Sequence, residues 1–200
     1  MISLVFKRAF ALFFIITSLL FANGSLVIRN DAILPQKTVD KINEIGKELR
    51  QKTGVSLYVA VVKKMDQKKI VDFEKSLTKD LKPPFILLAL SVEDQKVDIY
   101  SSDDVKKRFN KEQILSPYPW EGSIIPILTA HFKNQKAAIE AAILNGYSEI
   151  AEQVAKSYGI KLKSAIGNTN RNIYYWLRIL FYSIIALIFI NFIYRRYIKR

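Results

Sequence analysis

The chain has 200 residues, of which 50% are hydrophobic and 24% are charged, and its mean hydropathy is +0.09. This length and composition can provide the core of one ordinary domain, but apolar residues are concentrated in blocks at the two ends. The chain has no cysteine and one histidine, which excludes disulfide bonds, thiol catalysis, cysteine-based metal sites and two-histidine metal motifs.

The net charge of +13 is unevenly distributed along the chain. Eight of the 31 Lys and Arg residues lie in the terminal segments, whereas all 18 acidic residues lie between Asp31 and Glu152. The central part, with 23 basic and 18 acidic residues, therefore has a net charge of +5. Because most of the excess positive charge flanks apolar segments, it indicates membrane topology, and we expect no binding to nucleic acid.

Residues 1–24 have the organisation of a secretory signal peptide. Lys7 and Arg8 precede an apolar stretch at residues 9–21, which is short for a membrane span of about 20 residues. The small residues that follow predict cleavage before Ser25, and an uncleaved anchor is the alternative. Both alternatives leave the basic N-terminal region in the cytoplasm and the following residues outside it.

Residues 25–163 are predicted to form one exported domain. An extended run at residues 26–28 precedes an amphipathic helix at residues 36–52, which a glycine ends. The continuously apolar residues 55–62 predict a strand that is covered on both faces. A short helix is expected around residues 70–77, and residues 85–101 are expected to form a β-hairpin.

The second half of this domain is predicted to be helical. A short helix is expected from Asp103 or Asp104 through Phe109, and the next at residues 111–115. One or two further helices are expected at residues 124–132 and 137–158, ended by a glycine. The elements together predict an α/β fold, in which a small mixed β-sheet of three or four strands is flanked by helices.

The C-terminal part of the chain predicts a membrane anchor. Small and polar residues at 164–172 indicate a juxtamembrane linker, and residues 173–194 form an apolar stretch long enough as a helix to cross about 30 Å of hydrocarbon. A basic tail at residues 195–200 follows. The predicted anchoring residues are aromatic or basic side chains near the two membrane surfaces: Trp176, Arg178, Tyr194, Arg195 and Arg196.

The two ends predict the same topology. The positive-inside rule assigns both the N-terminal and the C-terminal basic residues to the cytoplasm. We therefore expect a single-pass protein of the cytoplasmic (inner) membrane, with its domain on the periplasmic or extracytoplasmic side and its C-terminus in the cytoplasm. The membrane bilayer is the first expected partner.

Three acidic residues are the candidates for a metal site. Asp31, Asp103 and Asp104 follow predicted strands, and side-chain oxygens on loops are the ligands that Ca²⁺ and Mg²⁺ prefer. Such an ion could polarise a phosphate ester. The alternative is that Asp31 satisfies backbone donors before a helix and that Asp103 and Asp104 start a helix.

A proline-flanked aromatic segment is the candidate for partner binding. Tyr118 and Trp120 lie within the segment S-P-Y-P-W at residues 116–120. Aromatic residues on a stiff loop suit a protein partner or the membrane interface. In the alternative, Trp120 covers the edge of the core and the prolines only end helices.

Several motifs together resemble the TPM domain family. They are N-D followed by L-P-Q-K-T-V-D-K-I-N, then K-T-G-V-S-L-Y-V-A-V-V, then F-I-L-L-A-L-S-V-E-D-Q-K-V-D-I-Y, and last I-I-P-I-L-T-A-H-F-K-N-Q-K-A-A-I-E-A-A-I-L-N-G. The resemblance covers residues 27–158. It implies an α/β sandwich on the outer side of a membrane, in a family associated with photosystem II repair, receptor modulation, divalent-metal binding and acid phosphatase activity.

The chain departs from the family pattern where chemistry is expected. Residues 81–84 are L-K-P-P in place of an acidic residue with Asn-Gly, and residues 101–104 are S-S-D-D in place of Gly-x-Gly, whereas Asp31 is retained. We therefore expect a non-enzymatic domain that assists assembly, repair or regulation of an integral membrane protein complex. A divalent-metal-dependent phosphatase of low activity is the alternative.

Overall fold

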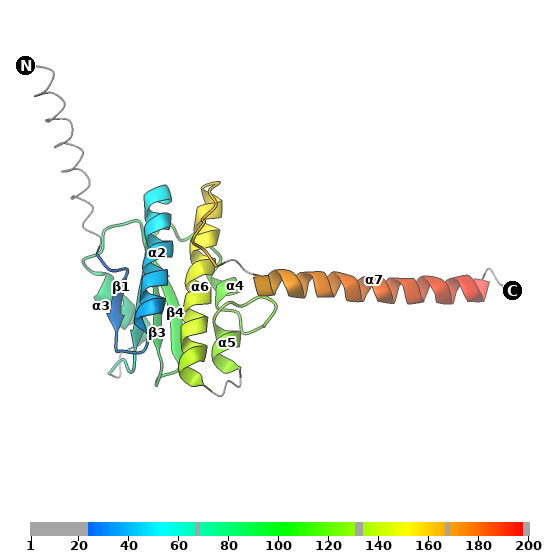
Figure 1. Ribbon diagram of the computed structural model, residues 1–200, viewed down its shortest axis with the longest axis horizontal. Coiled ribbons are helices and arrows are strands. Elements are labelled where there is room, and N and C mark those ends of the chain that lie inside the picture. The colour runs from blue at the N-terminus through cyan, green and yellow to red at the C-terminus, as the bar shows by residue number, and fades with distance from the viewer. Residues whose placement is uncertain (1–23, 67–68, 131–133, 167–168, 198–200) are drawn as a thin grey trace, which may run out of the picture.

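The computed structural model describes residues 24–66, 69–130, 134–166 and 169–197, so the predicted signal segment lies outside it except for Gly24. Figure 1 shows a sheet with helices on both of its faces and a long helix, α7, that projects away from the domain. This arrangement confirms the predicted α/β fold with a small mixed sheet flanked by helices.

The sheet has four strands in the order β1-β2-β3-β4, namely β1 (Val27–Asn30), β2 (Ser56–Val62), β3 (Phe85–Ser91) and β4 (Lys96–Ser101). β1, β2 and β3 are parallel, whereas β4 is antiparallel to β3, as the predicted hairpin requires. The carboxyl ends of β1, β2 and β3 therefore lie at one edge of the sheet, and the carboxyl end of β4 lies at the opposite edge.

The continuous apolar sequence of the central strands serves two separate cores. In β2, Leu57, Val59 and Val61 belong to the larger core, whereas Ala60 and Val62 belong to the smaller core on the other face. Successive side chains of a strand point to opposite faces. When both faces are covered, both sets of side chains are apolar, and the sequence does not alternate between apolar and polar residues.

Two long helices, α2 (Gln36–Thr53) and α6 (Gln135–Ser157), cover the face with the larger core. They pack closely because α2 has Gly46 where the Tyr147 side chain of α6 crosses it, and a Cβ atom at Gly46 would lie 2.0 Å from the Tyr147 hydroxyl oxygen. That buried hydroxyl donates to the carbonyl oxygen of Leu57 in β2 at 2.8 Å. The tyrosine therefore links both helices to the sheet.

The shorter helices differ more from the sequence prediction. α3 (Ile70–Thr78), which covers the other face, and α4 (Lys111–Ile114) lie where they were predicted. α5 (Ile125–Thr129) forms part of the helix that was predicted at residues 124–132, whose end lies outside the described residues. The helix predicted from Asp103 or Asp104 through Phe109 is wrong, because this segment forms hydrogen-bonded turns from Ser102 to Val105 and from Asp103 to Lys106.

The predicted linker is largely ordered against the domain or helical. Just before it, Leu162 is buried in the larger core, and within it the backbone N–H of Ile166 donates to the Ser148 hydroxyl of α6 at 2.9 Å. Helix α7 (Thr169–Tyr197) begins within residues 164–172 and continues through the apolar stretch. The chain therefore leaves the domain beside the middle of α6, where Figure 1 places the start of α7.

Candidate functional site

Three loops meet at the edge formed by the carboxyl ends of the parallel strands, where open α/β sheets commonly bind ligands. They are residues 31–35, 63–66 and 92–95. Each contains one of the three non-glycine residues of the described chain with positive φ: Ala32 (58°), Asp66 (48°) and Gln95 (50°). Because such backbone conformations are enriched at functional sites, this edge is a candidate binding site.

The Asn30-Asp31 pair connects two of these loops. The Asn30 side chain accepts the N–H groups of Ile33 and Leu34, each at 3.0 Å, and so shapes the turn before α2. The Asp31 carboxylate accepts the backbone N–H of Lys63 at 3.0 Å and lies 3.4 Å from the Nε atom of Arg29. Asp31 thus satisfies a backbone donor, as the alternative prediction proposed, but this donor belongs to the loop after β2 and not to a helix.

Asp94 performs the corresponding function in the third loop. Its carboxylate accepts hydrogen bonds from the Ser91 hydroxyl at 2.5 Å and from the backbone N–H of Met65 at 2.9 Å. These two donors, in that order, hold the pKa of the Asp94 carboxyl below its ordinary value. Asp31 and Asp94 therefore both use their oxygens to hold the loop after β2.

The other two predicted metal ligands lie at the opposite edge of the sheet. Asp103 and Asp104 are exposed and follow β4, which pairs Ser101 with Ile86 at the start of β3 and Lys96 with Ser91 at its end. The length of β3, about 20 Å at about 3.3 Å per residue, separates them from the edge that holds Asp31. The prediction that these three aspartates surround one ion is wrong, because β4 is antiparallel to the other strands.

The residues present do not form a divalent-cation site of the predicted kind. Within the described ranges, no three His, Asp or Glu side chains are grouped so that they could hold a metal ion. Hard cations require several oxygen ligands, and the oxygens of Asp31 already have partners. Binding of Ca²⁺ or Mg²⁺ by the protein stays a prediction.

One acidic residue of α3, which was not a candidate in the sequence analysis, has a buried side chain. Glu74 is 0% exposed, and neither of its carboxyl oxygens has a hydrogen-bond partner. Burial, and to a smaller extent the negative charge of Asp98, raise the pKa of the Glu74 carboxyl to about 8, while the Lys111 charge opposes them. Lys111 forms its ion pair with Asp98, at 2.6 Å. Glu74 is therefore neutral at neutral pH.

The predicted partner-binding aromatics are exposed together. Tyr118 is 53% and Trp120 is 57% exposed, and their rings stack with centroids 5.0 Å apart and an interplanar angle of 17°. The alternative in which Trp120 covers the edge of the core is wrong, because more than half of its surface is accessible. The two rings therefore form one exposed apolar surface, which carries the polar tyrosine hydroxyl and indole N–H groups.

The predicted anchoring residues lie on α7. Residues Trp176–Tyr194 form a helix that is long and apolar enough to cross a membrane, and none of it is buried against the rest of the described structure. Trp176, Arg178, Tyr194 and Arg196 are exposed, whereas the side chain of Arg195 lies outside the description. The Arg178 guanidinium lies 5.5 Å from the ring centroid of Tyr182, one turn further along.

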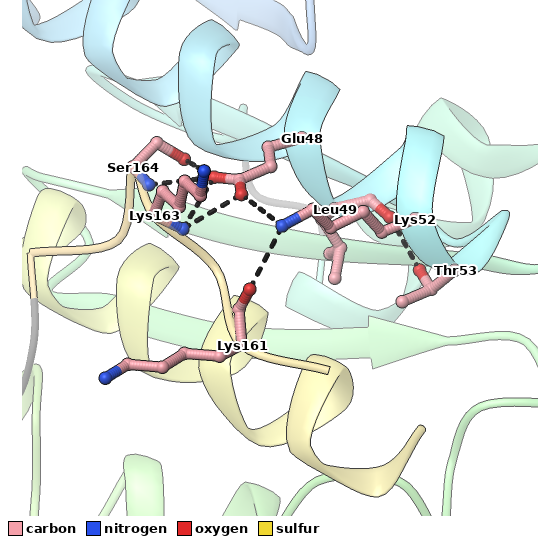
Figure 2. Close-up of polar contacts among 7 residues, drawn as sticks. All are labelled: Glu48, Leu49, Lys52, Thr53, Lys161, Lys163 and Ser164. Atoms are coloured by element: carbon pink, nitrogen blue, oxygen red, sulfur yellow. Dashed lines mark hydrogen bonds and ion pairs between the residues drawn. The ribbon is translucent and has the colours of Figure 1, made fainter. Parts of the chain in front are cut away.

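A cluster of polar contacts holds the segment between α6 and α7 against α2 (Figure 2). The Glu48 carboxylate accepts the backbone N–H groups of Lys163, at 2.9 Å, and of Ser164, at 2.8 Å, and also the Ser164 hydroxyl. Lys52 donates to Glu48 at 2.7 Å and to the Lys161 carbonyl oxygen at 3.0 Å. We call these five residues the clasp.

The clasp keeps Glu48 charged. Partial burial by itself would raise the pKa of this carboxyl, but the hydrogen bonds from Lys52, Ser164 and Lys163 outweigh it and lower the pKa to about 2. The sequence shows the Glu48 and Lys52 pair at the i,i+4 spacing of a helix. It contains no signal for the other half of the clasp, which lies more than a hundred residues further along the chain.

An open groove lies beside the clasp. It is bounded by residues 107–113, by the second half of α6 and by residues 160–165, and its walls carry both charges. The Arg108 guanidinium stacks 4.0 Å above the centroid of the Tyr158 ring, and Gln153 accepts the backbone N–H of Asn110 at 2.8 Å. The groove therefore offers cationic, anionic and amide groups next to the point where the chain leaves the domain.

Comparisons with known proteins identify the family of this chain. The NMR structure of the BA42 protein from the psychrophilic bacterium Bizionia argentinensis is similar, with 14% sequence identity, a TM-score of 0.46, and coverage of 72% of this chain and 95% of that chain. The comparison with curated proteins found no match. The model of a family described as the TPM domain matches residues 27–153, well over half of the chain. The chain therefore belongs to the TPM domain family.

Proposed function

We propose that this chain is a membrane-anchored TPM-domain protein whose domain, outside the cytoplasm, assists assembly, repair or regulation of an integral membrane protein complex without catalysing a reaction. The observation that carries the proposal is the contrast between α7 and the rest of the chain. Residues Trp176–Tyr194 are apolar and make no buried contact with the domain, and a helix of that kind is stable in a bilayer.

The arrangement of the domain supports an accessory function. The clasp holds the chain against α2 up to Ser164, so the domain stays close to the start of α7. Asp31 and Asp94 at the carboxyl edge hold the loop after β2. The groove beside the clasp has charged and amide groups that could bind a polar segment of a membrane protein.

The proposed topology is tested by labelling with a membrane-impermeant maleimide. The chain has no cysteine, so Lys79→Cys on the exposed end of α3 and Lys199→Cys in the basic tail each provide one thiol. In cells whose outer barriers are opened but whose cytoplasmic membrane is intact, we expect labelling at position 79 only. Labelling at position 199 only, or at neither position before lysis, would refute the topology.

The proposed partnership is tested by photo-cross-linking in intact membranes. A photoreactive amino acid replaces Lys107 at the groove, and in a control it replaces Asp40 on the exposed side of α2. We expect position 107 to yield a defined integral membrane protein that position 40 does not. Equal or no recovery of membrane proteins from both positions would refute a partner at this groove.

A second candidate is the low-activity, metal-dependent phosphatase, which is favoured by the position of Asp31 at the carboxyl edge of the parallel strands. It is tested with the full chain in detergent, a generic phosphomonoester, and Ca²⁺ or Mg²⁺ followed by chelator. This candidate requires that Asp31→Ala abolishes turnover and that Asp103→Ala, at the opposite edge, keeps it. No turnover with either metal would remove the candidate.

A further inference from the structure

The loop that carries Tyr118 and Trp120 is closed by its own hydrogen bonds. The Ser116 hydroxyl donates to the Glu121 carboxylate at 2.8 Å, and the N–H of Gly122 donates to the carbonyl oxygen of Tyr118 at 2.8 Å. A Cβ atom at Gly122 would lie 1.7 Å from the Ser116 carbonyl oxygen, so the two ends of the loop are in direct contact. The aromatic pair is therefore held out in a fixed position.

The base of this loop and the exit of the chain toward α7 share one face of α6. The Asn145 amide donates to the carbonyl oxygen of Ser123 at 2.8 Å, and the Ser148 hydroxyl accepts the N–H of Ile166 at 2.9 Å. Residues three apart on a helix have Cβ atoms about 5–6 Å apart. Figure 1 accordingly shows the loop between α4 and α5 on the flank of the domain from which α7 leaves.

The same flank lies close to the membrane if α7 spans it. The helix begins at Thr169 and its apolar window begins at Trp176, which leaves about 10 Å of helix at about 1.5 Å per residue. The headgroup region occupies about 5–8 Å on each side of the hydrocarbon core. The flank with the aromatic pair is thus within reach of the headgroups.

We propose that Tyr118 and Trp120 form a second membrane contact, which inserts into the lipid headgroup region and holds one flank of the domain against the bilayer. This inference rests on the proposed membrane anchoring. Aromatic rings with a polar tip are stabilised at the interface between hydrocarbon and water. The exposed Lys161 and Lys163 flank the exit of the chain, and their charges favour a surface that contains anionic lipids.

The chain offers a direct probe of this contact, because Trp120 and Trp176 are its two tryptophans. The full-length Trp176→Phe variant, reconstituted in vesicles of phosphatidylcholine and phosphatidylglycerol, leaves Trp120 as the reporter. With lipids brominated at the upper acyl positions, we expect about twofold lower Trp120 emission, since interfacial tryptophan lies within reach of that quencher.

The control places the reporter on the other face of the sheet. The variant Trp120→Phe, Trp176→Phe, Val71→Trp has its tryptophan at an exposed position of α3, and we expect no quenching there. If the protein floats with the vesicles after an alkaline wash and Trp120 is not quenched, the lipid contact is refuted and the pair is left for a protein partner. If the protein does not float, the membrane anchoring fails, and this inference fails with it.

Discussion

The two faces of the sheet have cores of different size, and a glutamate beside each core has a different charge state: Glu48 is ionised and Glu74 is protonated. On the face covered by α2 and α6, 25 buried apolar residues of the described part of the chain form the core, and Glu48 at its rim accepts hydrogen bonds from Lys52, Lys163 and Ser164. On the α3 face, the core has six buried apolar residues within the described part of the chain, and Glu74 of α3 is buried without a hydrogen-bond partner. The same residue type thus has a pKa of about 2 at one place and about 8 at the other.

This difference shows that local donors, and not burial alone, decide what a carboxylate contributes to stability. The oxygens of Glu48 are satisfied and ionised, so the charge holds a segment of chain in place. Those of Glu74 are unsatisfied and protonated, so the group opposes folding whenever it must ionise. We therefore expect the α3 face to be the weaker and the more pH-sensitive half of the domain.

The largest expected effect concerns Glu74. Its pKa is about 8 in the folded chain against 4.5 as the ordinary value, so unfolding releases a proton between these pH values and the free energy of unfolding falls as pH rises. Between pH 5 and pH 8, it should fall by about 3 kcal/mol more in the natural chain than in Glu74→Gln. Urea unfolding of the full chains in detergent micelles, followed by circular dichroism, measures this difference.

The matched control for this prediction is Asp72→Asn, an exposed acid on the same helix. This variant should keep the pH dependence of the natural chain. If Glu74→Gln has the same slope as the natural chain, the carboxyl of Glu74 is ionised in the folded state, and the contrast between the two faces is lost.

The second prediction concerns the close packing of α2 on α6. In Gly46→Ala the new methyl group would overlap the Tyr147 hydroxyl and the Leu26 side chain, which should lower the free energy of unfolding by about 2 kcal/mol. Arg50→Ala, at an exposed position of the same helix, is the control. Equal urea midpoints for the two variants would show that the α2 and α6 face tolerates repacking and is not the rigid half.

The smallest effect is local and concerns the clasp. Glu48→Gln keeps the shape of the side chain but removes the charge that accepts from Lys52, Lys163 and Ser164. Loss of about 1.4 kcal/mol of charge-assisted hydrogen bonding corresponds to about tenfold faster amide exchange at residues 163 and 164. Hydrogen–deuterium exchange with mass spectrometry on the full chain measures this rate.

Glu44→Gln is the corresponding control on α2, since Glu44 forms an exposed ion pair with the nearby Lys41. Exchange at residues 163 and 164 should be unchanged in this variant. If Glu48→Gln also leaves these amides protected, the segment is held by the burial of Leu162 and the clasp has no mechanical effect.

The secondary structure was largely predictable because it follows from local patterns. Helix α2 has a 3.6-residue stripe and a glycine at its end, with φ of 77° at Gly54, and both features are visible in the sequence. The turn after Ser102 was misjudged as a helix, because an aspartate before a polar segment suits a helix start and a turn equally well. Local chemistry cannot separate these two outcomes.

The candidate sites were less predictable because they depend on which strand ends meet. Asp31, Asp103 and Asp104 all follow strands, but the direction of β4 places the last two at the opposite edge. The prolines in the sequence drew attention to Tyr118 and Trp120, but only the structure showed that more than half of each side chain is exposed. Glu74 was missed because acids are usually solvated, although the spacing of Ile70, Phe73 and Leu77 places position 74 on the apolar face of α3.

The sequence by itself determined the α/β class, the order of the central elements, the apolar C-terminal helix and the family resemblance. These depend on periodicity, composition and short motifs, which are properties of neighbouring residues. Only the tertiary structure decided that Glu48 binds Lys163 and Ser164, that Glu74 is enclosed, and that Tyr118 and Trp120 share a flank with the exit toward α7. Each of these joins residues far apart in the chain, and such contacts exist only once the sheet and helices have packed.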